Sequence, residues 1–238
     1  MNNSLYDIWV YLAEDPLLAL TSTLLVYVVS NRLYLMAGRH PLLNPVLIAV
    51  IVLSGFLLLT DTAYDKYFEG AKFIHFLLGP ATVALAIPLY RHFQAVKSSA
   101  LAVMVSIIAG SLTAIASAVG IAWLLGADYQ TLVTIAPKSV TTPVAMGIAE
   151  KLGGLPSLTA VLVILTGIIG AALGHYVLNA LGVTHPAARG LALGVASHGI
   201  GTARALEINE AKGAFASLAM GLNALLTAIL LPLLVGFF

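Results

Sequence analysis

The run PSLTAVLVILTGIIGAALGHYVLNAL, residues 156–181, contains no Asp, Glu, Lys or Arg. A helix of about 20 apolar residues crosses the hydrocarbon core of a bilayer, so this run predicts a membrane-spanning helix. The composition of the whole chain supports this reading, because 60% of its 238 residues are hydrophobic and 9% are charged. Soluble domains carry roughly a quarter charged residues. The sequence therefore predicts one integral membrane domain over residues 1–238.

Apolar stretches separated by polar residues, Gly or Pro recur along the chain. They predict an all-α, polytopic membrane helix bundle of about eight segments, at 17–37, 44–60, 70–90, 98–126, 129–149, 156–181, 187–206 and 213–237. The loops after odd-numbered segments carry basic residues, namely Arg32, Arg39, Arg91, Lys97, Lys151 and Lys212. Since cytoplasmic loops are enriched in Lys and Arg, we expect these loops in the cytoplasm and both termini outside.

Several classes of function are disfavoured by the composition. The formal net charge is +1 and basic residues form no long run, so nothing indicates a nucleic-acid partner. The chain has no Cys, and its His residues lack the spacing of a metal site. Nucleophile-elbow and phosphate-binding motifs are also missing from the sequence. We expect a protein that is not an enzyme and that needs no metal and no cofactor.

Three of the predicted segments contain helix breakers beside polar residues. The breakers are Gly79, Pro80 and Pro88 in the third segment, Pro137 and Pro143 in the fifth, and Gly199 and Gly201 in the seventh. Proline removes a backbone donor and disturbs the turn before it, and glycine lets backbone groups approach a ligand. We therefore expect two or three broken or re-entrant helices.

An internal repeat is also indicated. Shifting the chain on itself by 60 residues places 138–142 over 198–202 and pairs Glu150 with Glu210. The same 60-residue shift also places residues 79–82 over residues 139–142. Each matching piece is an interrupted helix followed by an uninterrupted one, which is typical of transporters with internal symmetry. Shared membrane composition is the alternative explanation.

The interrupted helices predict an anion site. A broken helix presents unpaired N–H groups and the positive end of its dipole, and transporters place such ends near the membrane midplane. The candidate cations for a carboxylate are Lys138, His198 and Arg204. The candidate hydroxyls for a hydroxy or oxo group are Thr82, Ser139, Thr141, Thr142, Ser197 and Thr202. Structural alternatives stay open, because membrane Ser and Thr commonly bond their own backbone and Lys138 or Arg204 can reach an interface.

At these same stretches the sequence resembles the LrgB/CidB family, whose bacterial members include YohK-type proteins and whose plant relatives form part of the plastidial glycolate/glycerate translocator. The resemblance is carried by residues 44–45, 70–73, 77–90, 137–143, 153–160 and 197–205, and it runs from about residue 17 to the end of the chain. It implies a multi-pass protein of the bacterial inner membrane that acts beside a smaller LrgA/CidA-type membrane partner.

Two functions follow from the resemblance as expectations. One is transport of small carboxylates such as glycolate, glycerate or pyruvate, and the other is holin/antiholin-like control of murein hydrolase export and lysis. We favour a carrier with alternating access, of which an elevator-like movement is one version, because a pore has no use for broken helices lined with cations and hydroxyls. A homodimer is a further expectation for so small a carrier.

Overall fold

The computed structural model describes residues 16–40 and 43–235, and these residues contain helices and no β-strand. The chain divides into two compact units, Met1–Ala84 and Leu85–Phe238. The first unit contains α2 (Pro16–Met36), α3 (Pro45–Leu59), α4 (Tyr64–Phe76) and α5 (Leu78–Ala84). Within it, α2 packs against both α3 and α4, and the Thr23 hydroxyl lies 2.6 Å from the Tyr67 hydroxyl.

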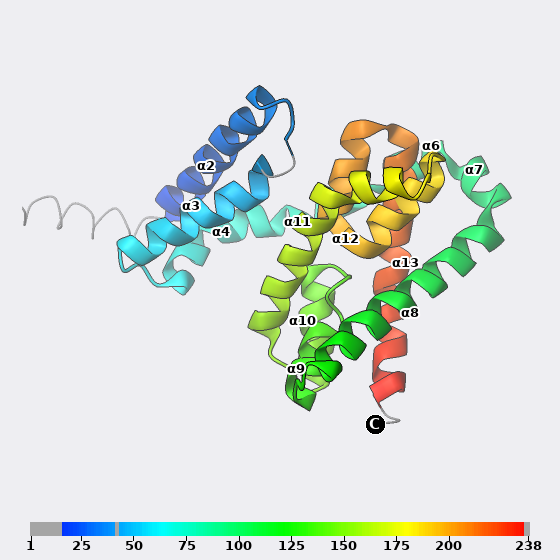
Figure 1. Ribbon diagram of the computed structural model, residues 1–238. Helices are drawn as coiled ribbons and strands as arrows, with labels where there is room; N and C mark the ends of the chain where they lie inside the picture. Colours follow the sequence, from blue (N-terminus) through cyan, green and yellow to red (C-terminus); the bar gives the residue numbers. More distant parts are fainter. Residues whose placement is uncertain (1–15, 41–42, 236–238) are drawn as a thin grey trace, which may run out of the picture. The chain divides into compact units, whose positions relative to one another are not determined.

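The second unit contains three long helices and several shorter ones (Figure 1). The long ones are α8 (Ala100–Leu124), α11 (Pro156–Ala180) and α13 (Glu210–Val235). The others are α6 (Ala86–Arg91), α7 (Phe93–Ser98), α9 (Tyr129–Ile135), α10 (Thr142–Lys151) and α12 (Pro186–Ile208). A helix rises about 1.5 Å per residue, so each long helix extends over the thickness of a bilayer.

Within the described part of the chain, five helical stretches are long and apolar enough to cross a membrane. They are Pro16–Met36, Tyr64–Arg91, Ala100–Leu124, Pro156–Ala180 and Glu210–Val235, and Pro45–Leu59 is a shorter apolar helix. The protein is therefore a multi-pass membrane protein, and the prediction of eight segments is not confirmed. The predicted segments at 129–149 and 187–206 both fold back on themselves.

The segment at 129–149 is a helical hairpin, here called the first hairpin (residues 129–151), made of α9 and α10. The Tyr129 hydroxyl donates to the Leu152 carbonyl over 3.3 Å, and the Gln130 amide lies 3.5 Å from the Gly153 carbonyl. A straight helix would separate residues 129 and 152 by about 34 Å. The chain instead turns at residues 136–141. Pro137 lies in this turn, and Pro143 lies in the first turn of α10, where a missing N–H is tolerated.

The segment at 187–206 forms the second hairpin (residues 186–208), which turns at His198. His198 has φ 40° and ψ −131°, far from helical values. A Cβ added to Gly194 would lie 2.3 Å from the Ala216 carbonyl oxygen, and the Thr202 hydroxyl lies 3.4 Å from the same oxygen. A straight helix would place residues 194 and 202 about 12 Å apart. The two limbs, 186–197 and 199–208, therefore lie side by side against α13.

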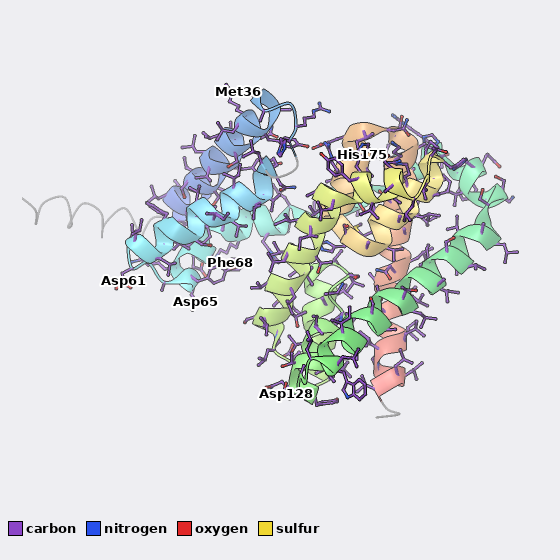
Figure 2. The ribbon with its side chains drawn as sticks, in the orientation of Figure 1. Met36, Asp61, Asp65, Phe68, Asp128 and His175 are labelled. Carbon is purple, nitrogen blue, oxygen red and sulfur yellow. The ribbon has the colours of Figure 1, made fainter. Side chains whose placement is uncertain are left out.

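The two hairpins enter the second unit from opposite ends. Helix α11 begins just after the first hairpin and ends just before the second, and its 25 residues separate the two bases. Asp128, before α9, and His175, near the end of α11, lie at opposite ends of this unit (Figure 2). Asp128 caps α9 by accepting a hydrogen bond from the Thr131 N–H, and hydrogen bonding to Thr131 lowers the pKa of this carboxyl.

Each hairpin enters and leaves the membrane on the same side, and this changes the orientation predicted for the loops that follow it. Arg91 of α6 pairs with Glu210 of α13 at 3.0 Å, so the ends of these helices share one face of the unit. That face also carries Lys97 and Lys212, together with Arg189 and Arg204 of the second hairpin, whereas the opposite face carries Asp128, Glu150 and Lys151. The positive-inside rule then favours Arg189 in the cytoplasm and Lys151 outside, the reverse of the alternation expected from eight crossings.

The third predicted interruption is a pair of one-residue breaks between assigned helices. The breaks are at Leu77, between α4 and α5, and at Leu85, before α6. Gly79 and Pro80 lie in the first turn of α5, and Pro88 lies in the first turn of α6. Each break precedes its proline by three residues, because the proline ring disturbs the preceding turn. The internal repeat stays a prediction, although each hairpin is followed by a long helix as the 60-residue shift requires.

Replacing Gly194 tests the packing of the second hairpin on α13. We expect Gly194→Ala to lower the stability of the detergent-purified protein by about 1–3 kcal/mol, because its Cβ would overlap backbone atoms of Ala216. Gly147→Ala is the matched control, since a Cβ at Gly147 in α10 would meet no atom within 4 Å. Thermal unfolding measures the stability of both variants, and equal melting temperatures for the two would contradict the close packing.

Single cysteines test the two-hairpin topology, because the natural chain contains none. We expect a membrane-impermeant maleimide to label Asp128→Cys and Lys151→Cys from one side of the membrane and Lys97→Cys and Lys212→Cys from the other. A straight span at 129–149 would instead place Lys151 on the side of Lys97 and Lys212. Comparing the labelling of intact cells with that of inverted vesicles shows from which side each cysteine is accessible and so distinguishes the two topologies.

Candidate functional site

The tips of the two hairpins meet at the side chain of Asn223 in α13. The Asn223 amide nitrogen donates to the Ser139 carbonyl of the first tip over 3.0 Å and to the Val195 carbonyl of the second hairpin over 3.2 Å. Its carbonyl oxygen accepts from the hydroxyl of Ser111 in α8 and lies 3.5 Å from that of Thr227. The side chain is 1% exposed, and all of its hydrogen-bonding groups have partners.

This meeting point lies halfway through the predicted membrane. Asn223 is in the middle of the 26-residue α13, and Ser111 is near the middle of the 25-residue α8. Non-helical backbone at membrane depth is tolerated where it is buried in protein or lines a cavity. The shared amide satisfies two carbonyls that the interrupted helices leave free, and it therefore holds both interruptions at mid-depth.

The tip of the second hairpin fits into a face of α11 that is made of glycines. A Cβ at Gly167 would lie 2.7 Å from the His198 ring, and one at Gly170 would lie 1.8 Å from the Ser197 hydroxyl. The His198 Nε2 lies 2.9 Å from the Val163 carbonyl, which only accepts, so this nitrogen carries the proton. Close approach of the tip to α11 thus depends on the absence of side chains at these glycines.

A cavity of about 590 Å³ opens beside the first tip, between α8 and the 186–197 limb of the second hairpin. The α8 wall carries hydroxyls, the α12 wall is apolar, and the first tip contributes one cation. The lining residues are Ser106, Ala109, Gly110, Thr113, Ala114, Ser117, Lys138, Ser139, Ala188, Leu191, Ala192, Val195 and Ala196. This combination offers one positive charge, several hydroxyls and apolar surface to a small solute.

Lys138 is the charged residue of this cavity. Its side chain is half-buried, and its ammonium has no ion pair or hydrogen bond with any residue that the structure describes. Ser139, its neighbour, is held by Asn223, so Lys138 lies close to mid-depth. An isolated charge at this depth is costly, and an anion in the cavity would offset the cost.

The other predicted cations lie elsewhere. His198 is buried against α11, and Arg204 forms an ion pair with Glu207 at 2.9 Å near the end of α12. The structure therefore brings the two interruptions together, while it places Lys138, His198 and Arg204 in three different surroundings. Of these three, Lys138 alone is among the residues that line the cavity. The reason is the fold-back at His198, which directs the rest of the hairpin along α13.

The predicted hydroxyl residues and glycines also lie in different parts of the structure. Ser139 lines the cavity, whereas Thr141 and Thr142 begin α10. Thr202 is buried and donates to the His198 carbonyl over 2.8 Å, and the buried Ser197 hydroxyl has no partner among the described residues. Gly199 follows the tip, and a Cβ at Gly201 would lie 2.5 Å from that of Ser197. Thr82 belongs to α5 in the other unit, and its side chain lies outside the described residues.

Sequence reasoning missed two features of this site. Asn223 stands alone in an apolar helix, and an isolated amide at membrane depth is itself a signal of function or assembly. Ser106, Gly110, Thr113 and Ser117 recur every three or four residues, which places them on one face of α8. The described residues contain no cluster of three His, Asp or Glu side chains that could hold a metal ion.

Comparisons with known proteins found matches that cover almost the whole chain. The family model described as "LrgB-like family" matches residues 23–237. The uncharacterized protein YwbG of Bacillus subtilis is 37% identical, with 93% of this chain and 98% of YwbG covered. The holin-like protein CidB of Staphylococcus epidermidis is 34% identical, with 94% and 97% covered.

The antiholin-like protein LrgB of Bacillus mycoides is 32% identical, with 93% of this chain and 96% of the relative covered. No solved structure matches the chain significantly. A family model that matches from residue 23 to residue 237, together with relatives aligned over nearly their full length, shows that this protein belongs to the LrgB-like family.

Proposed function

We propose that the protein is a carrier for small organic anions, namely monocarboxylates that resemble glycolate, glycerate or pyruvate. The observation that carries the proposal is Lys138, an ammonium without a partner among the described residues, in a cavity beside the meeting point of two interrupted helices. Carriers use such interruptions to expose a binding site near the midplane. The hydroxyls of the α8 wall give a small hydroxy or oxo acid additional partners.

Alternating access is the mechanism that this arrangement favours. Hairpins from opposite ends of the unit offer one gate toward each side of the membrane, and both belong to the unit Leu85–Phe238. An elevator-like version of this mechanism has both hairpins, which belong to the same unit, moving together. The interruptions at Lys138 and His198 belong to this moving part.

A second candidate function is holin- or antiholin-like control of murein hydrolase export and lysis in the bacterial inner membrane. The names of the relatives, holin-like CidB and antiholin-like LrgB, support this alternative more directly than they support a carrier. The same names support a small LrgA/CidA-type membrane protein as partner. A homodimer is proposed on the size of the chain alone.

One experiment separates the two functions. The protein is reconstituted in liposomes, with and without an LrgA/CidA-type partner, and counterflow of labelled glycolate, glycerate, pyruvate and lactate is measured beside leakage of a trapped dye. Saturable counterflow with no dye leakage supports the carrier. Dye leakage that depends on size alone, with no saturable exchange of any acid, contradicts the carrier and supports the pore.

Neutralising Lys138 tests the anion site. We expect Lys138→Gln to reduce glycolate counterflow roughly tenfold or more, the loss that follows from removing a charge-assisted hydrogen bond of about 1.5–3 kcal/mol. Lys151→Gln is the matched control, because Lys151 lies on the same hairpin and is exposed. Arg204→Gln should reduce transport less than Lys138→Gln, since Arg204 lies outside the cavity. Unchanged counterflow in Lys138→Gln would remove the proposed site.

A further inference from the structure

The base of the second hairpin carries a buried arginine whose hydrogen bonds reach no acidic group. Arg189, in the first turn of α12, is 8% exposed. It donates to the Asn179 side-chain oxygen and to the Val183 carbonyl over 2.8 Å each, and it lies 3.0 Å from Nδ1 of His175. The ion pairs among the described residues do not include Arg189. A buried charge without a counter-ion is costly, so an anion nearby would be stabilising.

The contacts of Arg189 fix the proton of the His175 ring. A guanidinium only donates, so Nδ1 of His175 is the acceptor and the ring proton is on Nε2. This Nε2 lies 3.0 Å from the Asn179 amide nitrogen, and the Asn179 oxygen already accepts from Arg189. Two donors, the ring N–H and the amide N–H, therefore face each other.

Other proton placements move this conflict without removing it. Reversing the Asn179 amide would place its nitrogen against Arg189, which also only donates. A proton on Nδ1 of His175 would face the other nitrogen of the guanidinium, and a doubly protonated ring would add a positive charge beside it. The three side chains thus hold one more donor than they can satisfy among themselves. The surplus lies at the two exposed members, His175 and Asn179.

These donors lie at the depth of lipid headgroups. His175 and Asn179 belong to the last turns of α11, within about 8 Å of its end at Ala180. His175 lies at one end of its unit (Figure 2). The exposed Tyr176 packs edge-on against the His175 ring, with ring centroids 5.7 Å apart. Tyrosine is enriched at membrane interfaces, so this end of α11 is typical of the boundary between hydrocarbon and water.

A lipid phosphate matches both the donors and the charge. An anionic oxygen that bridges the ring N–H and the amide N–H would satisfy both, and charge-assisted hydrogen bonds are stronger than neutral ones. The same charge would compensate the guanidinium behind them. The positive-inside rule favours this face in the cytoplasm, where the membrane leaflet carries anionic lipids. The exposed apolar side chains of Ile169 and Leu173 continue along α11 toward the middle of the membrane, where they can contact acyl chains.

We propose that His175 and Asn179 bind the phosphate of an anionic phospholipid, with Arg189 behind them as the source of the positive field. Because Arg189 belongs to α12 and its two partners belong to α11, the bound lipid secures the base of the second hairpin to α11 at the membrane surface. This site is separate from Lys138 and does not depend on the carrier function.

Replacing Asn179 by Asp tests the donor count. The carboxylate keeps the shape of the amide, accepts from Arg189 and His175 together, and supplies the missing negative charge. We expect Asn179→Asp to raise the melting temperature of the delipidated, detergent-purified protein by about 2–4 °C. It should also weaken binding of phosphatidylglycerol roughly tenfold or more, as the loss of one charge-assisted hydrogen bond predicts.

Asn209→Asp is the matched control. It adds the same charge at an exposed position on the same face, and its side chain can still accept from the Lys212 N–H. It should leave the affinity for phosphatidylglycerol within about twofold of that of the natural protein, since one exposed charge is largely screened. An equal loss of affinity in both variants would show a general charge effect and overturn the site.

Native mass spectrometry and thermal unfolding measure the response to phosphatidylglycerol, phosphatidylcholine and inorganic phosphate. We expect phosphatidylglycerol to bind most tightly and to raise the melting temperature of the natural protein most. Equal effects of the two lipids would overturn the recognition of net negative charge, and an equal effect of inorganic phosphate would overturn a lipid as the occupant. Unchanged phosphatidylglycerol affinity in Asn179→Asp, or a lower melting temperature of this variant without lipid, would overturn the site.

Discussion

The amide of Asn223 joins two backbone carbonyls that reach it from opposite ends of the unit Leu85–Phe238. Because each hairpin stops halfway, its turn leaves carbonyl groups without helical partners at a depth where water is scarce. One buried side chain with two donor hydrogens satisfies one carbonyl from each hairpin, and α8 contributes a hydroxyl to the amide oxygen. The positions of both interruptions, and with them the position of Lys138, depend on this interaction.

Packing around the amide follows from small residues. Glycines of α11 admit the second tip, and Gly190 and Gly194 let its first limb lie directly on the backbone of α13. These close contacts are van der Waals contacts, which drive helix association in a membrane where apolar burial gives little advantage. The tightly packed second hairpin contrasts with the first tip, whose Lys138 opens onto the cavity. The second hairpin is thus held by close packing, and the first hairpin presents the positive charge of Lys138 to the cavity.

Much of this arrangement was accessible from the sequence. The long apolar runs predicted α8, α11 and α13, and Pro137, Pro143 and the glycines near His198 marked both interruptions. The direction of the chain after each interruption was not accessible, because hydropathy gives the same signal for a span and for a hairpin of equal length. Only contacts distant in sequence, such as Tyr129 with Leu152, show the fold-back. The same limit explains why His198 and Arg204 were grouped with Lys138.

The central claim is that the two tips meet at mid-depth beside Asn223, and a cross-link between them tests it most directly. Ser139→Cys and Ala196→Cys place one thiol on each hairpin, both facing the same cavity in a chain without other cysteines. In native membranes, a short bifunctional thiol reagent should join the two hairpins, visible as a fused fragment after proteolysis at the α10–α11 connection. Reaction of each cysteine with a monofunctional reagent, with no cross-link between them, would contradict the account.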